Sequence, residues 1–126
     1  MSVALEFRPS KIVARDESGT PQGFNIGIER QSEGLYTFGL FNSSGWIKGS
    51  TITTTTGILF LLPSLPTGQS QWLPGNSEPV YSFVAYDFYL DVYAGDPTMF
   101  RCLRIPKSEL HAAIINAVCA DLPRGT

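Results

Sequence analysis

The fold is decided by residues 80–93, whose sequence is VYSFVAYDFYLDVY. Apolar side chains recur at every second position of this stretch, which is the period of a β-strand with one face on a core. The odd positions mix aromatic residues with Asp87 and Asp91, so we expect them to form an amphipathic outer face. The even positions are mostly apolar and predict the buried face: Val80, Ser82, Val84, Tyr86, Phe88, Leu90 and Val92.

A second strand and a helix are expected after this stretch. Residues 94–97 are typical of a turn, and a strand over residues 99–105 would return beside the first with Arg101 opposite Asp91. Pro106 suits the first position of a helix, and the pattern predicts a C-terminal amphipathic helix over residues 106–122. The side chains that we expect it to place on or beside the sheet are Leu110, Ile114, Ile115, Val118 and Leu122.

The chain before residue 80 predicts mainly further strands. Residues 24–29 and 35–41 predict a β-hairpin with its turn at residues 31–34. One or two short strands, broken at Pro9, are expected in residues 5–14.

Residues 48–79 predict two strands and a loop. The threonine-rich residues 48–57 predict an edge strand, and the apolar run 58–62 predicts another strand. Residues 63–79 contain many Pro, Gly and Ser residues around Trp72, so we expect a long irregular loop there.

Together these elements predict an α+β protein. We expect a curved antiparallel β-sheet or half-barrel of about six or seven strands, packed against the C-terminal helix. The chain should form a single domain over residues 1–126, because 43% of its residues are hydrophobic and only 16% are charged. That composition supplies a core and is unlike that of a disordered chain.

Charge and hydropathy argue against two classes of partner. The formal net charge is −2 and the basic residues are scattered, so we expect no nucleic-acid binding by direct phosphate contact. The longest apolar run, residues 58–62, is too short to span a bilayer, so we expect no membrane partner. The first residues do not resemble a secretory signal, so we expect a cytoplasmic protein in which Cys102 and Cys119 are free thiols.

Nucleophilic and metal chemistry have little support in the sequence. His111 is the only histidine, and no serine lies in a glycine-flanked nucleophile motif. Cys102 falls beside Leu90 in the expected strand pairing, which predicts a small buried side chain. Two cysteines and one histidine are too few ligands for a transition metal. We therefore expect no catalytic residue, no metal and no cofactor.

A catalytic pair of carboxylates is also not expected. Asp87 and Asp91 would lie roughly 13 Å apart along one strand, beyond the roughly 5 to 9.5 Å used by glycosidases. A pair formed by Asp87 and a distant acid, Glu29 or Glu33, stays open.

The surface is the remaining candidate for function. Aromatic side chains are favoured at protein interfaces because Tyr and Trp cover much area at a low entropic cost. The predicted partner-binding residues are therefore Trp46, Trp72, Tyr81, Asp87, Tyr89, Asp91 and Tyr93. The first hypothesis is a small protein-binding module, such as an inhibitor, an immunity-type neutraliser, or a phage or host accessory factor.

Two other hypotheses stay open. The chain could be a small-ligand-binding half-barrel or a minimal enzyme, with a pocket between helix and sheet under Trp72. That pocket would be lined by Tyr86, Phe88 and Ile114. The chain could instead be a structural subunit of an assembly, including a homodimer, whose copies pair along the threonine-rich edge.

Overall fold

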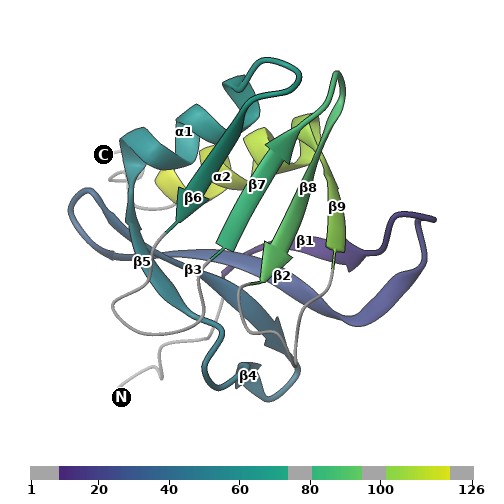
Figure 1. Ribbon diagram of the computed structural model, residues 1–126. Helices are drawn as coiled ribbons and strands as arrows, with labels where there is room; N and C mark the ends of the chain where they lie inside the picture. Colours follow the sequence, from purple (N-terminus) through teal and green to yellow (C-terminus); the bar gives the residue numbers. More distant parts are fainter. Residues whose placement is uncertain (1–8, 74–80, 95–101, 120–126) are drawn as a thin grey trace, which may run out of the picture.

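A computed structural model describes residues 9–73, 81–94 and 102–119 of the 126-residue chain. The described part contains nine strands and two helices (Figure 1). In chain order these are β1 (Ser10–Arg15), β2 (Pro21–Ser32), β3 (Leu35–Asn42), β4 (Gly45–Trp46), β5 (Ile52–Thr55), α1 (Thr56–Ser64), β6 (Ser70–Leu73), β7 (Tyr81–Ala85), β8 (Tyr89–Ala94), β9 (Cys102–Pro106) and α2 (Lys107–Cys119).

The strands form two antiparallel sheets. The N-terminal sheet has five strands in the order β1-β2-β3-β4, with β5 also paired to β3. The C-terminal sheet has four strands in the order β6-β7-β8-β9. The predicted α+β class is confirmed, but the prediction of one sheet with six or seven strands is wrong. The chain leaves the first sheet through α1 and begins a second sheet at β6.

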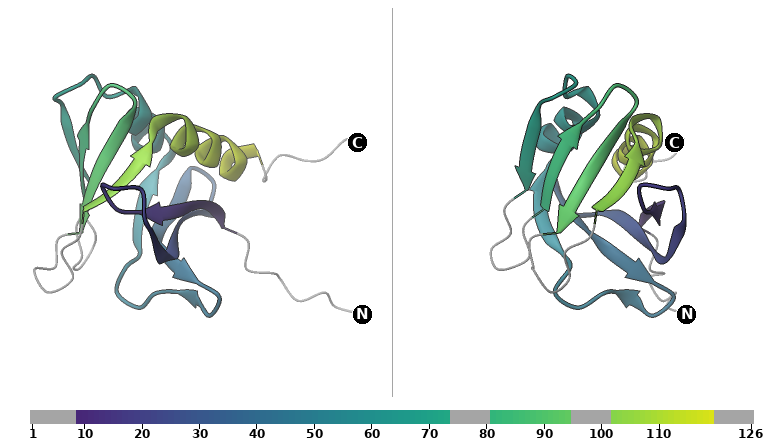
Figure 2. Two further views of the ribbon diagram at one scale, coloured as in Figure 1. Left: turned by 90° about the vertical axis from the view of Figure 1, so that its right-hand side faces the viewer. Right: turned by 45° about the vertical axis from the view of Figure 1, so that its right-hand side comes forward.

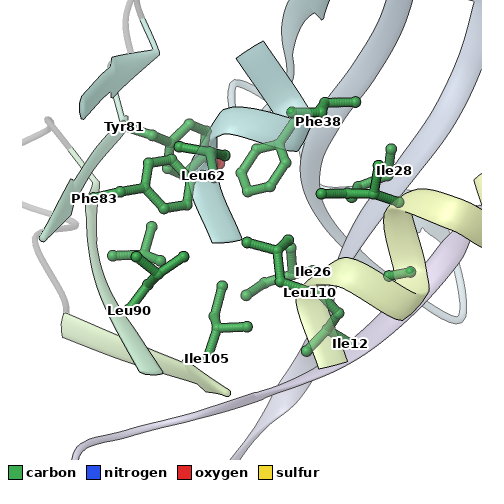
Figure 3. Packing of buried hydrophobic residues seen from close by; sticks show 14 of the residues in the cluster. Ile12, Ile26, Ile28, Phe38, Leu62, Tyr81, Phe83, Leu90, Ile105 and Leu110 are labelled. Atoms are coloured by element: carbon green, nitrogen blue, oxygen red, sulfur yellow. The ribbon is translucent and has the colours of Figure 1, made fainter. Parts of the chain in front are cut away.

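The core lies between the two sheets and is completed by the helices. Figure 2 shows α2 extending from the C-terminal sheet over β1 and β2, which it contacts. The Phe38 ring of the N-terminal sheet meets the rings of Tyr81 and Phe83 edge-on, at centroid distances of 5.1 and 5.6 Å. Leu62 of α1 and Leu110 of α2 point into the same cluster (Figure 3). The predicted packing of the C-terminal helix on sheet is therefore confirmed.

The first hairpin matches its prediction, whereas the threonine-rich edge strand is confirmed in part: of residues 48–57 only Ile52–Thr55 form a strand, and residues 56 and 57 begin α1. Strands β2 and β3 pair antiparallel with Ile28 opposite Phe38, and Gly34 in the turn has a φ of +75°. Strand β5 pairs only with β3 in the described part of the chain, so it is an edge strand. Strand β1 begins at Ser10 after Pro9, whereas the earlier part of the predicted strand region lies outside the described residues.

The predicted strand over residues 58–62 is wrong, because these residues lie in helix α1. The Thr55 hydroxyl caps the helix by accepting a hydrogen bond from the Ile58 N–H at 3.4 Å. Leu59 and Leu62, three residues apart, are both fully buried.

The predicted loop over residues 63–79 is wrong in part. Pro63 and Ser64 end α1, and Ser70–Leu73 form β6. The section of this region from residue 74 onwards lies outside the described residues.

Residues 81–94 form a hairpin and not one long strand. Residues 86–88 separate β7 from β8, and this three-residue interruption reverses the parity of the core-facing positions. In β8 the even residues Leu90 and Val92 are buried, as predicted. In β7 the odd residues Tyr81 and Phe83 are buried instead, so the predicted core face of this segment is wrong.

The last strand and helix also depart from the predicted register. Arg104 lies opposite Asp91, so the prediction of Arg101 as its cross-strand partner is wrong. Ile105, and not Cys102, lies opposite Leu90. Helix α2 begins at Lys107, and residues 120–122 of the predicted helix lie outside the described part.

Candidate interaction surface

The C-terminal sheet turns one face outward from the core. Alternation along each strand places the side chains of this face, and the register aligns them in rows across the sheet. One row is Trp72, Ser82, Tyr93 and Cys102. The next row is Ser70, Val84, Asp91 and Arg104, and Tyr89 stands beside Pro106 at the end of β9. We call these residues the outer face of the C-terminal sheet.

Arg104 organises the centre of the outer face. Its Nε and Nη2 donate to the two carboxylate oxygens of Asp91 at 2.9 and 3.1 Å. Its guanidinium carbon lies 3.9 Å from the centre of the Tyr89 ring, which stacks in turn on Tyr86 at 4.8 Å. Hydrogen bonding to Asp91 raises the pKa of Arg104. The stacked side chains therefore have fixed positions before any partner arrives.

The tip of the β7–β8 hairpin, residues 86–88, is tied to the body of the protein on two sides. The Asp87 carboxylate accepts a hydrogen bond from the Thr67 hydroxyl in the segment before β6. The Phe88 carbonyl accepts one from the Lys107 N–H at the start of α2, at 2.9 Å. The backbone of the tip is thus held in place. The Phe88 side chain is nevertheless 82% exposed, and that of Tyr86 is 37% exposed.

Cys102 and Tyr93 form a neighbouring cross-strand pair on the outer face. Hydrogen bonding to Cys102, with a smaller contribution from burial, raises the pKa of Tyr93 to about 12. Burial raises the pKa of Cys102 to about 11. Both groups are therefore protonated at neutral pH, and the Cys102 thiol is a poor nucleophile there.

The structure brings five of the predicted partner-binding residues to the outer face of the C-terminal sheet or to the hairpin tip. Trp72 on β6 is 58% exposed, and Asp87 at the tip is exposed. Tyr89 and Tyr93 on β8 are half-buried. Asp91 also lies on this face, but it is only 2% exposed because Arg104 covers it. The expectation that Asp91 is free to touch a partner is wrong.

Two other predicted residues lie elsewhere. Tyr81 is 1% exposed, and its hydroxyl donates to the Ser50 carbonyl across the core, so its predicted outward position is wrong. Trp46 belongs to the N-terminal sheet, where it meets the Phe41 ring edge-on at 5.7 Å. Its ring end also lies against Gly27. Trp46 is therefore not part of the outer face of the C-terminal sheet.

Phe88 and Tyr86 are the surface residues that the sequence pattern assigned to the core. If apolar residues alternate without a break over residues 80–93, Tyr86 and Phe88 fall on the same face of the strand as Leu90. Asp87, which lies between them, is the residue that could have indicated a turn. The predicted pocket lined by Tyr86, Phe88 and Ile114 is also wrong. The first two side chains are exposed at the tip, whereas Ile114 of α2 is fully buried.

The candidate chemical groups are dispersed. His111 is an exposed residue of α2 that meets the Phe60 ring at 6.1 Å. Within residues 9–73, 81–94 and 102–119, no three His, Cys, Asp or Glu side chains gather as metal ligands would. Neither of the described helices has the length and apolar character needed to cross a bilayer.

Comparisons with protein-family models, with curated proteins and with solved structures find no match for this chain. The outer face and the hairpin tip are therefore the features of the molecule that point to a function.

Proposed function

We propose that this chain is a protein-binding module that contacts its partner through the tip of the β7–β8 hairpin. The observation that carries the proposal is Phe88, which is 82% exposed while its carbonyl accepts a hydrogen bond from the Lys107 N–H. An exposed aromatic ring on a fixed backbone loses little conformational freedom on binding. Aromatic side chains of this kind are frequent binding hot spots.

Burial of the Phe88 ring favours a partner with an apolar pocket. Burying a phenylalanine ring contributes about 1.5–3 kcal/mol relative to leaving it in water. Tyr86, stacked on Tyr89, adds aromatic surface beside it, and Asp87 supplies an exposed carboxylate. We therefore propose a pocket that takes the Phe88 ring and has hydrogen-bond donors at its rim for Asp87.

The ligand-binding half-barrel is less favoured, because the side chains expected to line its pocket do not face one another. The two cysteines of the described region, Cys102 and Cys119, are free thiols. Free thiols are usual in a reducing compartment, and on this ground we propose that the binding takes place in the cytoplasm.

The proposal is tested by affinity capture from extracts of the source cells with three forms of the chain as bait. The wild type is compared with Phe88→Ala and with Ile115→Ala. Ile115 is a matched control because it is a large exposed side chain, 38% accessible, on α2. A partner recovered with the wild type and with Ile115→Ala, but not with Phe88→Ala, would support the proposal. Equal recovery with all three baits would refute it.

A further inference from the structure

The hydrogen bonds between β6 and β7 determine which backbone groups of β6 face its free edge. Among the described strands, β6 pairs only with β7 and ends the C-terminal sheet (Figure 1). Just before β6 a bulge occurs at Gly68, whose φ is +88°. Gly68 N–H donates to the Ala85 carbonyl, and Ala85 N–H donates to the Gln69 carbonyl, each at 2.9 Å.

The bond between Ala85 and Gln69 shows which residues of β6 direct their backbone groups toward β7 and which direct them toward the free edge. Residues of an antiparallel strand alternate between bonding to one neighbour and to the other. Since Gln69 bonds to β7, Gln71 and Leu73 do so as well, and Ser70 and Trp72 direct their N–H and C=O groups to the free edge. The Trp72 carbonyl accepts a 3.0 Å bond from the Gln71 side chain.

The edge lacks the charges that commonly protect edge strands from pairing. None of the residues of β6, Ser70–Leu73, is charged. In contrast β1, the first strand of the N-terminal sheet, carries Lys11 and Arg15. Trp72 on β6 is 58% exposed. An uncharged edge beside an exposed indole is suited to pairing with another strand.

We infer that two copies of the chain pair β6 with β6, antiparallel about a two-fold axis at Gln71, and join their C-terminal sheets into one. In this register Ser70 of each copy lies opposite Trp72 of the other. Each such pair exchanges both backbone N–H···O bonds, because both residues direct these groups outward. The two Gln71 side chains meet at the two-fold axis. There each side-chain amide can give up its hydrogen bond to the Trp72 carbonyl of its own chain and bond to the Gln71 side chain of the other copy.

Two features favour a second copy as the occupant. The pairing sets small Ser70 against large Trp72, so each indole has room on the outer face of the other sheet. Ser70 is followed across the sheet by half-buried Val84, which the indole of the second copy can cover. In addition, the two-fold operation brings no like charges together within β6. Because the paired edge is short, we expect a weak, reversible dimer.

Amide hydrogen exchange, followed by NMR on the wild-type chain at about 0.05 and about 1 mM, tests this inference; the upper value reaches weak complexes. The Gln71 and Leu73 amides, bonded to β7, should exchange slowly at both concentrations. The Ser70 and Trp72 amides should exchange fast at the lower concentration and several-fold more slowly at the higher one. Unchanged exchange at Ser70 and Trp72 would overturn the inference, as would protection that appears only along β5, the edge first expected to pair.

A pair of variants tests the same interface by sedimentation velocity. Ser70→Pro removes one outward N–H but no bond to β7, and proline is tolerated on edge strands. Ser70→Ala keeps that N–H and is the control. The average mass of the wild type and of Ser70→Ala should rise with concentration, while that of Ser70→Pro should stay monomeric. Equal association of all three would overturn the inference. If Ser70→Pro fails to fold, the exchange experiment on the wild type decides.

Discussion

Arg104 and Asp91 form a pair whose members differ in their access to water. The Asp91 side chain is 3% exposed, whereas that of Arg104 is 31% exposed. A charge left without its partner is costly where water cannot reach it and less costly where water can. The two residues should therefore respond unequally to substitution, although they share the same bonds.

We predict that Arg104→Met destabilises the protein more than Asp91→Asn does. The first change leaves the buried Asp91 carboxylate without its partner, at a cost of about 3–5 kcal/mol. The second leaves a half-exposed guanidinium that water can solvate, at about 1.5–3 kcal/mol. Urea denaturation of both variants measures the free energies of unfolding. Equal losses, or a larger loss for Asp91→Asn, would contradict this reading of the pair.

Gly27 is a residue whose lack of a side chain is required by close packing. A Cβ at this position would lie 2.7 Å from Phe41 Cδ1 and 2.9 Å from Trp46 Cη2. We predict that Gly27→Ala costs about 1–3 kcal/mol and moves the indole of Trp46. Fluorescence in a Trp72→Phe background, in which Trp46 is the remaining tryptophan, should then shift to longer wavelength.

Gly57→Ala is the control for this substitution. Nothing lies within 4 Å of a Cβ at Gly57 in α1, so this change should leave both stability and Trp46 emission nearly unaltered or raise stability slightly. If Gly27→Ala behaved as Gly57→Ala does, the close contact with Phe41 and Trp46 would be disproved.

At the scale of elements, turn chemistry explains which hairpin was predictable. The β2–β3 turn contains Gly34 with a φ of +75°, and glycine before an alternating strand is a recognised hairpin signal. The β7–β8 turn is built from Tyr86, Asp87 and Phe88, and no non-glycine residue of the described part has a positive φ. Without glycine or proline to interrupt it, alternation appeared continuous, and Phe88 was assigned to the core.

Helix α1 was missed for a different reason. Residues 58–62 are apolar at every position, so neither a period of two nor one of 3.6 can be recognised within them. Buried Leu59 and Leu62 share a helical face, while Leu61 is 44% exposed. In a strand, Leu59 and Leu61 would have shared a face instead.

This difference gives a direct prediction for α1. Leu59→Ala and Leu62→Ala should each destabilise the protein by about 2–5 kcal/mol. Leu61→Ala should change stability by less than about 0.5 kcal/mol because its side chain already contacts water. Thermal and urea unfolding of the three variants checks the pattern. Similar losses at residues 59 and 61, with little at residue 62, would indicate a strand.

At the scale of the whole molecule, the Tyr81 hydroxyl joins the two halves of the chain by bonding to the Ser50 carbonyl. Burial raises the pKa of Tyr81 well above its ordinary value of 10.0. A group whose pKa is higher in the folded than in the unfolded protein contributes its full stabilisation at pH values below the unfolded-state pKa. This contribution is lost as the pH rises from the unfolded-state pKa toward the folded-state pKa. The Tyr81 contribution should therefore be complete at neutral pH and decline above about pH 10.

We predict that Tyr81→Phe is about 1 kcal/mol less stable than the wild type at pH 7. Above about pH 10 the difference should shrink and then reverse, because phenylalanine has no proton to lose. Tyr93 titrates in both proteins, so its effect cancels. Urea denaturation between pH 7 and pH 11 measures the difference in free energy of unfolding between the two proteins. A difference that stays constant over that range would contradict the burial of the Tyr81 hydroxyl.

The division into two sheets limits how far the binding surface could be predicted from sequence. Trp72 is exposed as expected of a Trp in a polar segment, and Tyr89 lies on the outer face, half-buried, because alternation holds within β8. Tyr81 was misplaced because its orientation depends on where the β7–β8 turn lies. The assembly of the tip from Thr67, Asp87 and Lys107 depends on contacts between distant segments, which a pattern along the chain does not contain.

The most direct test of the account is isothermal titration calorimetry of the purified partner, once captured, against the wild type, Phe88→Ala and Ile115→Ala. We predict that Phe88→Ala raises the dissociation constant at least about 30-fold, as expected for a hot spot worth about 2 kcal/mol. Ile115→Ala should bind like the wild type. A Phe88→Ala variant that binds with the wild-type dissociation constant would contradict the assignment of the hairpin tip as the binding site.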